Sequence, residues 1–328
     1  MASILVVNAG STSLKLDLVA ESETTRRIAS LAEAPGEVAA VGHRIVHGGA
    51  RFHDPVVVDP DVKHEIAELS VIAPLHNGPA LEAIDEAQRA LPDVPHVAVF
   101  DTAFHASIPD EAATYAVPKR WRQEWGIHRY GFHGLSVQWA SERVPVPRLV
   151  VCHLGGGCSV TAVADGRSVE TTMGFSPLEG VPMATRSGSV DPGALFYLLR
   201  EGLLTVEELD HALEHESGLE ALGGLDDSLG LAVYTHRIAA AVAAMAASLG
   251  GLDAIVFTAG VGENVPAVRA EVCRRLGFLG IQLDQAANDS AEPDVDIGSS
   301  GSEVRVVVVR AREEVVVARA VRALGYGS

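Results

Sequence analysis

One stretch of the chain, residues 149–163 (LVVCHLGGGCSVTAV), limits the possible folds most strongly. An apolar run ends in Gly155, Gly156 and Gly157, and a second apolar run follows. The pattern predicts a buried strand, a loop and a second strand, and glycines in such a loop let backbone N–H groups approach an anion such as phosphate. A glycine-rich hairpin is also common as a plain turn, so the pattern alone leaves both interpretations open.

The N-terminus repeats this design. Residues 4–7 (ILVV) run into a polar loop, residues 8–13 (NAGSTS), and residues 14–19 (LKLDLV) form the next apolar run. Two strand–loop–strand units about half a chain apart indicate an internal duplication with two facing loops.

Length, composition and charge narrow the class. A chain of 328 residues can form two domains with a large core, and its 48% hydrophobic and 21% charged residues are typical of a globular protein. The formal net charge of −18 disfavours nucleic acid and anionic membranes as partners, because no run of lysine or arginine offsets the repulsion. An anionic small substrate would therefore need local arginines in a cleft.

The cysteines and the first residues indicate a cytoplasmic protein. Cys152, Cys158 and Cys273 have no metal-ligand spacing, which predicts reduced, buried thiols. The first residues lack a basic region, so we expect no signal peptide. Residues 238–249 are apolar but few and rich in alanine, and a buried helix explains them better than a membrane span.

Two arginines stand in glycine-rich or small-residue surroundings. Arg44 follows a strand-like run and precedes Gly48 and Gly49. A water-facing arginine at a strand end is the commoner arrangement, so a substrate cation and a surface residue are about equally favoured here. Arg186 lies in the long irregular segment 169–193, and such segments are usually functional or mobile, so we expect it to be a second substrate cation.

Three further features end strands or begin helices. Asp101 follows the apolar run 96–100, where open α/β sheets place ligands and metals, although aspartate also caps helices. His133 stands at an expected helix start and could donate to a phosphoryl oxygen, although a lone histidine is more often structural. Residues 259–264 (AGVGEN) place Gly-x-Gly between an expected strand and helix, which suits both nucleotide loops and tight turns.

Helix and loop patterns fill the remaining chain. They predict a turn over residues 73–77, a helix over 79–91, a helix over 232–249 and a polar, mobile loop over 287–302.

The motifs, in this order, resemble those of the acetate kinase family, within the superfamily of sugar kinases, heat-shock chaperones and actin. The matching motifs span nearly the whole chain: residues 8–15 (NAGSTSLK), 42–49 (GHRIVHGG), 73–77 (APLHN), 100–105 (FDTAFH), 130–134 (YGFHG), 153–155 (HLG), 173–180 (MGFSPLEG), 185–188 (TRSG) and 257–264 (FTAGVGEN). The joint match is highly specific.

The resemblance implies an α/β fold of two duplicated ribonuclease-H-like (actin-like ATPase) domains with a cleft between them. Residues 1–102 plus 315–328 would form the acceptor-side domain, closed by the C-terminal helix. Residues 103–314 would form the second domain, with the phosphate loop, the nucleotide side and a dimer interface.

The implied activity is reversible, Mg²⁺-dependent phosphoryl transfer from ATP to acetate, giving acetyl phosphate and ADP, with propionate as a weaker substrate. Mn²⁺ could replace Mg²⁺. The implied partners are a small carboxylate, a nucleotide and a second copy of the chain.

The resemblance also assigns roles. Arg44 and Arg186 would hold the carboxylate and the transferring phosphoryl group, and His133 would donate to that group, with Asn8 and His76 nearby. Phosphoryl transfer asks the protein mainly for positioning and charge stabilisation, which these residue types supply.

Further assignments concern the metal, the acceptor pocket and the nucleotide. A carboxylate nucleophile is already ionised at neutral pH, so no general base is needed and Asp101 can join Glu313 or Glu314, with Asn8, around the metal. The pocket for the methyl group would be Val46, Leu75, Phe132 and Pro177. The nucleotide and its phosphates would contact Ser11, Ser13, Lys15, His153, Gly155, Gly156, Gly157, Gly260, Val261, Gly262 and Asn264.

The departures from the family lie on the nucleotide side. The chain is shorter than typical members between residues 219 and 234, and Gly156 replaces a family asparagine. These departures leave two alternatives open: the same acceptor with another donor, such as pyrophosphate, or a non-catalytic homologue that binds nucleotide or acyl phosphate.

Overall fold

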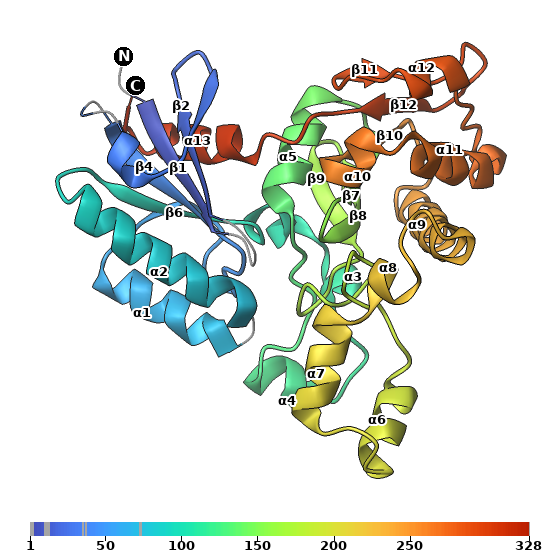
Figure 1. Cartoon of the computed structure of the whole chain (residues 1–328), viewed down its shortest axis with the longest axis horizontal. Helices are drawn as coiled ribbons and strands as arrows, with labels where there is room; N and C mark the ends of the chain where they lie inside the picture. The colour runs from blue at the N-terminus through green and yellow to red at the C-terminus, as the bar shows by residue number, and fades with distance from the viewer. Residues whose placement is uncertain (1–2, 10–13, 35, 37, 72–73, 328) are drawn as a thin grey trace. The chain divides into compact units, whose positions relative to one another are not determined.

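The structure, a computed structural model, describes residues 3–9, 14–34, 36, 38–71 and 74–327, and for residues 71 and 74–76 it describes the backbone alone. The chain forms two compact units (Figure 1). Unit 1 contains residues 1–106, 132–139 and 312–328, and unit 2 contains residues 107–131 and 140–311.

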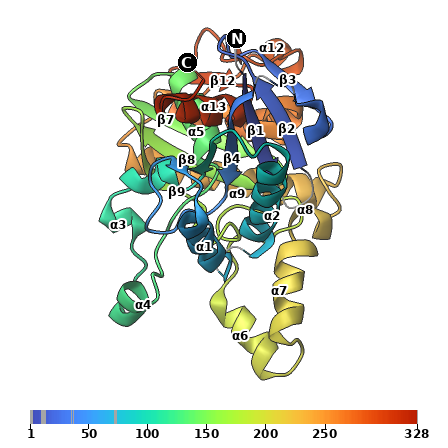
Figure 2. The ribbon, with the colours of Figure 1, turned by 90° about the vertical axis from the view of Figure 1, so that its left-hand side faces the viewer.

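Unit 1 is built on a six-stranded sheet with the order β3-β2-β1-β4-β6-β5. Its strands are β1 (Ser3–Ala9), β2 (Leu14–Val19), β3 (Thr25–Ile28), β4 (Val38–Ile45), β5 (Val56–Val57) and β6 (His96–Phe100). The central strand β1 pairs antiparallel with β2 and parallel with β4 (Figure 2). Strand β4 in turn pairs parallel with β6.

Unit 2 repeats this topology. Its six-stranded sheet has the order β11-β12-β10-β7-β8-β9. The strands are β7 (Arg148–Leu154), β8 (Cys158–Ala164), β9 (Arg167–Thr171), β10 (Ala254–Thr258), β11 (Val295–Asp296) and β12 (Arg305–Val308). Again the central strand, β7, is antiparallel to β8 and parallel to β10, so the predicted duplication is confirmed.

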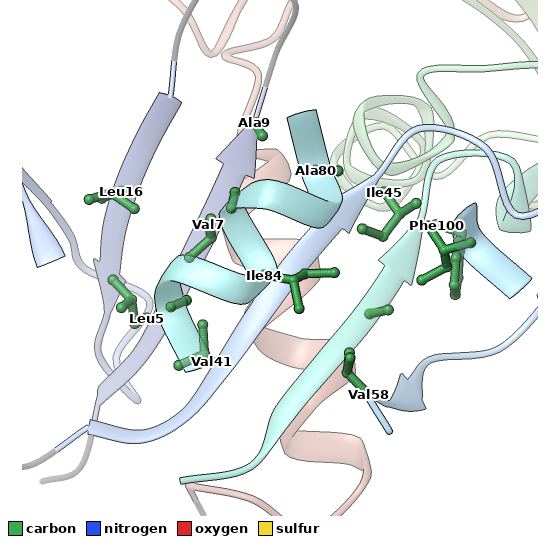
Figure 3. Close-up of a cluster of buried hydrophobic side chains, with 14 of the residues drawn as sticks. Leu5, Val7, Ala9, Leu16, Val41, Ile45, Val58, Ala80, Ile84 and Phe100 are labelled. Atoms are coloured by element: carbon green, nitrogen blue, oxygen red, sulfur yellow. The ribbon is translucent and has the colours of Figure 1, made fainter. Parts of the chain in front are cut away.

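Helices cover both faces of the unit 1 sheet. These helices are α1 (Pro60–Glu68), α2 (Pro74–Ala90) and α13 (Glu313–Ala323), with 3₁₀ turns η1 (Leu31–Glu33), η2 (Leu69–Val71) and η3 (Ala103–Ser107). Figure 3 shows Ala80 and Ile84 of α2 over the apolar side chains of β1 and β4, with α13 behind the sheet. Both faces of the strands are therefore buried, which explains their continuous apolar runs.

Unit 2 carries more helices than unit 1. They are α3 (Asp110–Ala113), α4 (Lys119–Glu124), α6 (Pro192–Arg200), α7 (Val206–His215), α8 (Gly218–Ala221), α9 (Ser228–Ser248), α10 (Ala259–Asn264), α11 (Pro266–Arg275), η4 (Gly277–Leu279) and α12 (Gln285–Asp289). The two units divide within one further helix, α5 (Gly134–Arg143).

Three predicted segments differ from the structure. The predicted turn over 73–77 is instead the start of α2, which begins at Pro74 and continues through Pro79. The helix expected from residue 232 begins at Ser228, because the Asp227 carboxylate accepts the N–H groups of Leu229 and Gly230 as an N-cap. The polar segment 287–302 contains the end of α12 and the edge strand β11 rather than a continuous loop.

The apolar helix α9 belongs to the core of unit 2. By length and composition it could cross a membrane, but it contacts β7, β8 and β9, and its residues Ile238, Val242 and Met245 are buried. The buried-helix prediction is confirmed. The three cysteines are also buried free thiols, as expected.

Candidate active site

An ion-pair cluster lies at the ends of two parallel strands in unit 1. Arg44, near the end of β4, donates from Nε to Asp101 Oδ1 at 3.0 Å and also pairs with Oδ2 of the same carboxylate. It donates to Asn8 Oδ1 on β1 at 3.0 Å, and its Nε lies 3.4 Å from Glu313 Oε2 on α13. The structure therefore brings together Asn8, Arg44, Asp101 and Glu313, four residues predicted for the site.

Two carboxylates share one arginine in this cluster. Asp101 is fully buried, and the side chains of Arg44 and Glu313 are 13% and 16% exposed. Burial and the charge of Glu313 raise the pKa of Asp101 to about 6, and Arg44 offsets this only in part. Burial alone would lower the pKa of Arg44, but the charges of Asp101 and Glu313 raise it above its usual value. The cluster has one negative charge in excess and is suited to a further cation.

The donor set of this cluster fits Mg²⁺. Two carboxylates and the Asn8 amide offer oxygen ligands, and Mg²⁺ commonly binds one or two carboxylates together with substrate phosphates and water. Among the described residues there is no group of three or more His, Cys, Asp or Glu side chains placed to hold a metal. Of the two glutamates that begin α13, Glu313 lies at Arg44, whereas Glu314 accepts from Thr25 Oγ1 at 3.3 Å.

His133 is fixed next to Asp101 through the backbone. It has a φ of 59°, in the left-handed region that non-glycine residues rarely adopt, immediately before α5. The next residue, Gly134, donates its N–H to the Asp101 carbonyl at 3.0 Å. A Cβ on Gly134 would lie 2.0 Å from that oxygen, so the close approach requires glycine. Backbone strain of this kind is typical of functional sites.

The residues predicted for the acceptor pocket are only partly described. Val46 and Phe132 are buried in unit 1, and the rings of Phe132 and His47 meet edge to face at 5.4 Å. Asn77 on α2 is fully buried and exchanges two hydrogen bonds with the His47 backbone. Pro177 is a buried residue of unit 2. The side chains of Leu75 and His76, and the residues Ser11 and Ser13, lie outside the described part of the chain.

Three segments predicted for the nucleotide or phosphate meet within unit 2. The loop Gly155, Gly156 and Gly157 joins β7 to β8, and the Gly156 carbonyl accepts from Ala184 N at 3.2 Å. A Cβ on Gly155 would lie 3.4 Å from Ala259 Cβ, at the start of α10. The glycine loop, the segment that carries Arg186 and the turn that contains Gly260 are therefore neighbours.

The remaining predicted residues of the nucleotide side belong to both units, Lys15 to unit 1 and the others to unit 2. His153 is nearly buried near the end of β7, and Lys15 is exposed on β2, opposite Asn8 in the register. Gly260 and Asn264 are exposed, and Val261 and Gly262 are more buried. Asn264 donates to the Gly260 carbonyl at 2.8 Å, so this side chain closes its own turn.

Two residues that the sequence analysis missed support the α10 turn. The Glu263 carboxylate accepts from Ala259 N and Ala311 N, each at 2.9 Å, and Ala259 has a φ of 66°. Arg269, which is 1% exposed, donates to the carbonyls of Gly262 and Glu263 and to Asn288. A buried arginine in an ordinary helix has no sequence signal that separates it from a surface arginine.

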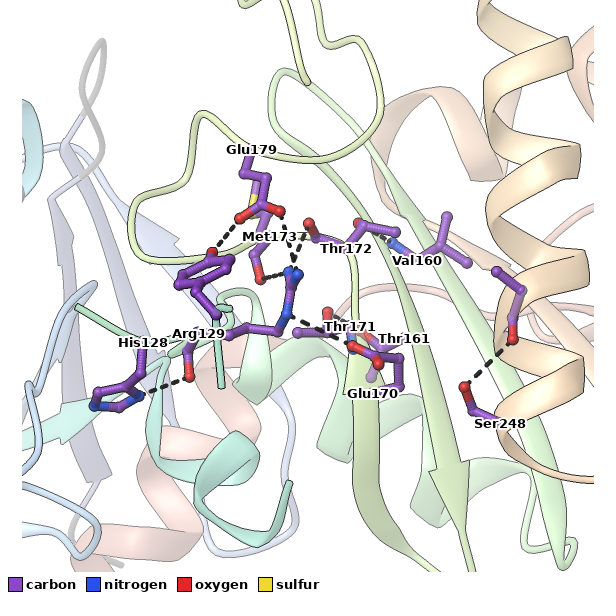
Figure 4. A network of polar contacts seen from close by, with 12 residues as sticks. His128, Arg129, Val160, Thr161, Glu170, Thr171, Thr172, Met173, Glu179 and Ser248 are labelled. Atoms are coloured by element: carbon purple, nitrogen blue, oxygen red, sulfur yellow. Dashed lines mark hydrogen bonds and ion pairs between the residues drawn. The ribbon is translucent and has the colours of Figure 1, made fainter. Parts of the chain in front are cut away.

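A second missed group fixes the loop after β9 (Figure 4). Arg129 donates to the carbonyls of Thr172 and Met173 at 3.1 and 3.0 Å, and to Glu179 Oε1 at 3.2 Å. Tyr115 donates to the other oxygen of Glu179, and its own oxygen accepts from Phe175 N. The loop that carries Pro177 is therefore held by a partly buried polar network rather than by regular structure.

Duplicated actin-like sheets, a glycine loop at the end of a buried strand and an arginine held between carboxylates define a two-domain phosphotransferase of the actin-like ATPase class. The comparisons agree. A model of the acetokinase family matches residues 28–319. The acetate kinase of Nostoc punctiforme is 47% identical over 307 residues, which cover 86% of this chain and 76% of that protein.

Solved structures give the same result. A propionate kinase from Francisella tularensis has a TM-score of 0.91 and 31% identity, and the match covers 98% of this chain and 99% of that one. The acetate kinase of Porphyromonas gingivalis has a TM-score of 0.85 and 29% identity over 99% of this chain and 100% of that one. The chain belongs to the acetokinase family. Membership makes it a kinase with a carboxyl group as acceptor, which favours an enzyme over a binding-only homologue.

Proposed function

We propose that this chain is an acetate kinase, which transfers the γ-phosphoryl group of ATP reversibly to acetate and gives acetyl phosphate and ADP, with propionate as a weaker acceptor. A carboxylate oxygen attacks the γ-phosphorus, and the bond from that phosphorus to the ADP oxygen breaks. The observation that carries the proposal is the position of Arg44, held near the end of β4 by Asp101, Glu313 and Asn8. Relatives that are named acetate kinase support the acceptor.

Two arginines and a histidine supply the charge stabilisation in this proposal. Arg44 and Arg186 hold the acetate carboxylate and the transferring phosphoryl group, and His133 donates to that group, with Asn8 and His76 beside it. An arginine placed at the transferring phosphoryl group is worth a factor of about 10³ or more in rate. The pre-formed ion pairs of Arg44 support this role, because a guanidinium that is already oriented loses less entropy when an anion binds.

Mg²⁺ would be held by Asp101 and Glu313, with the Asn8 amide as a further oxygen ligand. When bound, the metal would neutralise charge on the donor phosphates. The excess negative charge of the cluster supports this assignment.

The methyl group of acetate would lie against Val46, Leu75, Phe132 and Pro177. A pocket of this kind discriminates by roughly 1–3 kcal/mol per methylene group, so acetate is favoured over propionate without excluding it. The buried positions of Val46, Phe132 and Pro177 are consistent with an apolar contact.

The nucleotide would bind along the glycine loop, Lys15, His153 and the α10 turn, with Ser11 and Ser13 from the first loop. One observation favours a second candidate donor, pyrophosphate. Gly156 is exposed and has no atom within 4 Å of an added Cβ, so the loop lacks a side-chain donor toward a nucleotide.

A donor screen tests the proposal. Acetyl phosphate formation would be measured with ATP, GTP and pyrophosphate, each with acetate or propionate and with Mg²⁺ or Mn²⁺. We expect turnover with ATP, acetate and Mg²⁺, and a higher KM for propionate. If only pyrophosphate supports turnover, the donor is pyrophosphate rather than ATP. If no donor supports turnover, the kinase assignment is refuted.

We also propose a cytoplasmic homodimer. Five large apolar side chains from residue 190 to the first residue of α7 are each more than 40% exposed: Val190, Phe196, Tyr197, Leu203 and Val206. Such a group on one segment is typical of a protein interface.

A further inference from the structure

The segment that carries Arg186 is fixed to the C-terminal turn of α7. Thr185 Oγ1 donates to the Glu214 carbonyl at 2.8 Å, and Ser187 N donates to the Leu213 carbonyl at 3.0 Å. These two bonds flank Arg186 on both sides in the sequence. The backbone of Arg186 is therefore anchored to a helix end, although the segment itself has no regular structure.

The chain that follows α7 holds the same segment from a second direction. Ser217 N donates to the Thr185 carbonyl at 2.8 Å, and Leu219 N donates to the Met183 carbonyl at 2.9 Å. Gly218 has a φ of 62°, and a Cβ there would lie 2.7 Å from the Arg186 carbonyl oxygen. This close contact requires glycine and leaves Arg186 little freedom to shift.

The Arg186 side chain is fixed as well. Its Nε lies 2.6 Å from Glu214 Oε2, and the two side chains are only 13% and 14% exposed. At this burial the attraction between the two charges is screened by solvent less than in an exposed ion pair. The same residue, Glu214, thus holds Arg186 through its carboxylate and the neighbouring Thr185 through its carbonyl.

We propose that Glu214 is a positioning residue for Arg186 and fixes the orientation in which the guanidinium receives the transferring phosphoryl group. The inference rests on the proposed function of Arg186. Glu214 contacts no reacting atom in this scheme. It acts by holding the arginine in place before substrate binds, so that binding energy is not used to order it.

Kinetics of matched variants provide the first test. Glu214→Gln keeps the size of the side chain and removes its charge, Glu214→Asp keeps the charge, and Glu216→Gln is the control. Glu216 is on the same helix end, 66% exposed, and its Oε1 lies 3.5 Å from His211 Nε2. A displaced group of this kind costs up to about 10²-fold in rate, so we expect Glu214→Gln to lower kcat by about that factor with a smaller change in the KM for acetate.

We expect Glu214→Asp to recover part of kcat and Glu216→Gln to match the wild type. Thermal unfolding of each variant checks that it is folded. A wild-type kcat in folded Glu214→Gln would overturn the proposal, and so would equal losses in Glu214→Asp and Glu214→Gln.

A second measurement needs no turnover. In protein labelled with ¹⁵N-arginine, the Nε–H signal of Arg186 is assigned by its loss in Arg186→Lys. We expect that signal to be shifted or broadened in Glu214→Gln and unchanged in Glu216→Gln. If the wild type fails the donor screen but shows this difference, the proposed function fails and the Arg186–Glu214 pair stands. If the signal is the same in both variants, the positioning role fails whatever the activity.

Discussion

The charge balance around Arg44 leads to an asymmetric prediction for two substitutions. Arg44→Gln removes the cation that pairs with two largely buried carboxylates, Asp101 and Glu313. Breaking a buried pair in this way costs about 3–5 kcal/mol, because uncompensated charge is left behind. Asp101→Asn instead leaves one arginine with one carboxylate and retains an amide oxygen. Its cost should be nearer that of a lost hydrogen bond to a charged group, about 1.5–3 kcal/mol.

The assay is urea unfolding of the two variants and the wild type near neutral pH. Arg51→Gln is the control, since Arg51 pairs with Glu65 while 72% exposed, and we expect it to cost at most about 1 kcal/mol. The loss in Arg44→Gln should shrink as the pH falls towards about 5. The pKa of Asp101 is already raised to about 6 in the wild type, and without Arg44 protonation removes the uncompensated charge at still higher pH. The charge-balance argument is refuted if Asp101→Asn is as destabilising as Arg44→Gln.

Three further predictions concern the pH response, the donor loop and the assembly. Burial and the charge of His96 lower the pKa of His43 to about 3, so the unfolded chain binds this proton first. This group alone should lower the unfolding free energy by about 2 kcal/mol between pH values of about 7.5 and 5, and we expect the pH dependence of His43→Gln to lack that contribution. If urea unfolding gives the same dependence of unfolding free energy on pH in His43→Gln and in the wild type, this prediction is contradicted. The Gly156→Asn side chain would enter open space at the glycine loop. We expect this variant to lower the KM for ATP by about 3- to 10-fold through one new hydrogen bond. A KM equal to that of the wild type would argue against nucleotide binding at this loop. We expect Phe196→Glu to convert the proposed dimer into a monomer, as measured by light scattering. Phe278→Glu, at an exposed site elsewhere in unit 2, is the control and should leave the dimer intact. A wild-type protein that is already monomeric would refute the proposed interface.

The strands of both sheets could be predicted from the sequence because they are buried on both faces. Strands β1, β7 and β10 are continuous apolar runs that end at polar or glycine-containing segments, and the repeat of this pattern predicted the duplication. Helix starts were harder to predict. Pro79 is a plausible first residue, but α2 begins at Pro74, and Asn77 in its first turn exchanges buried hydrogen bonds with the backbone of His47, outside the helix. That contact joins residues far apart in the chain, so no local pattern contains it.

The sequence predicted that Asn8, Arg44, Asp101 and a glutamate of α13 would lie together, but not which of these residues pair with each other. Glu313 and Glu314 are adjacent and chemically identical, and only the packing of α13 on β1 and β4 decides which of them lies at Arg44. Residues at neighbouring helix positions point about 100° apart, so a small change in that packing would exchange their roles. Glu214 lies in helix α7, 28 positions after Arg186, and nothing in its sequence context separates it from the exposed Glu216.

Arg44 and Arg186, the two proposed substrate cations, share one feature: each is held by ion pairs with carboxylates from other segments of the chain. In an acidic chain of net charge −18, an arginine meant for an anionic ligand can pair with surface carboxylates in many ways. Arg44 and Arg186 are each fixed by carboxylates from distant segments, Asp101 and Glu313 in one case and Glu214 in the other. Such an ion pair lowers the long-range attraction of the guanidinium group for an anion. It also fixes the orientation of the guanidinium group before substrate binds, and this matters more when catalysis depends on positioning. The charge around the proposed substrate arginine differs between the two units. Arg44 pairs with two carboxylates that are proposed to bind a divalent cation, whereas Glu214, which pairs with Arg186, is not a proposed metal ligand. Occupancy of the metal site should therefore change the anion affinity of Arg44 more than that of Arg186.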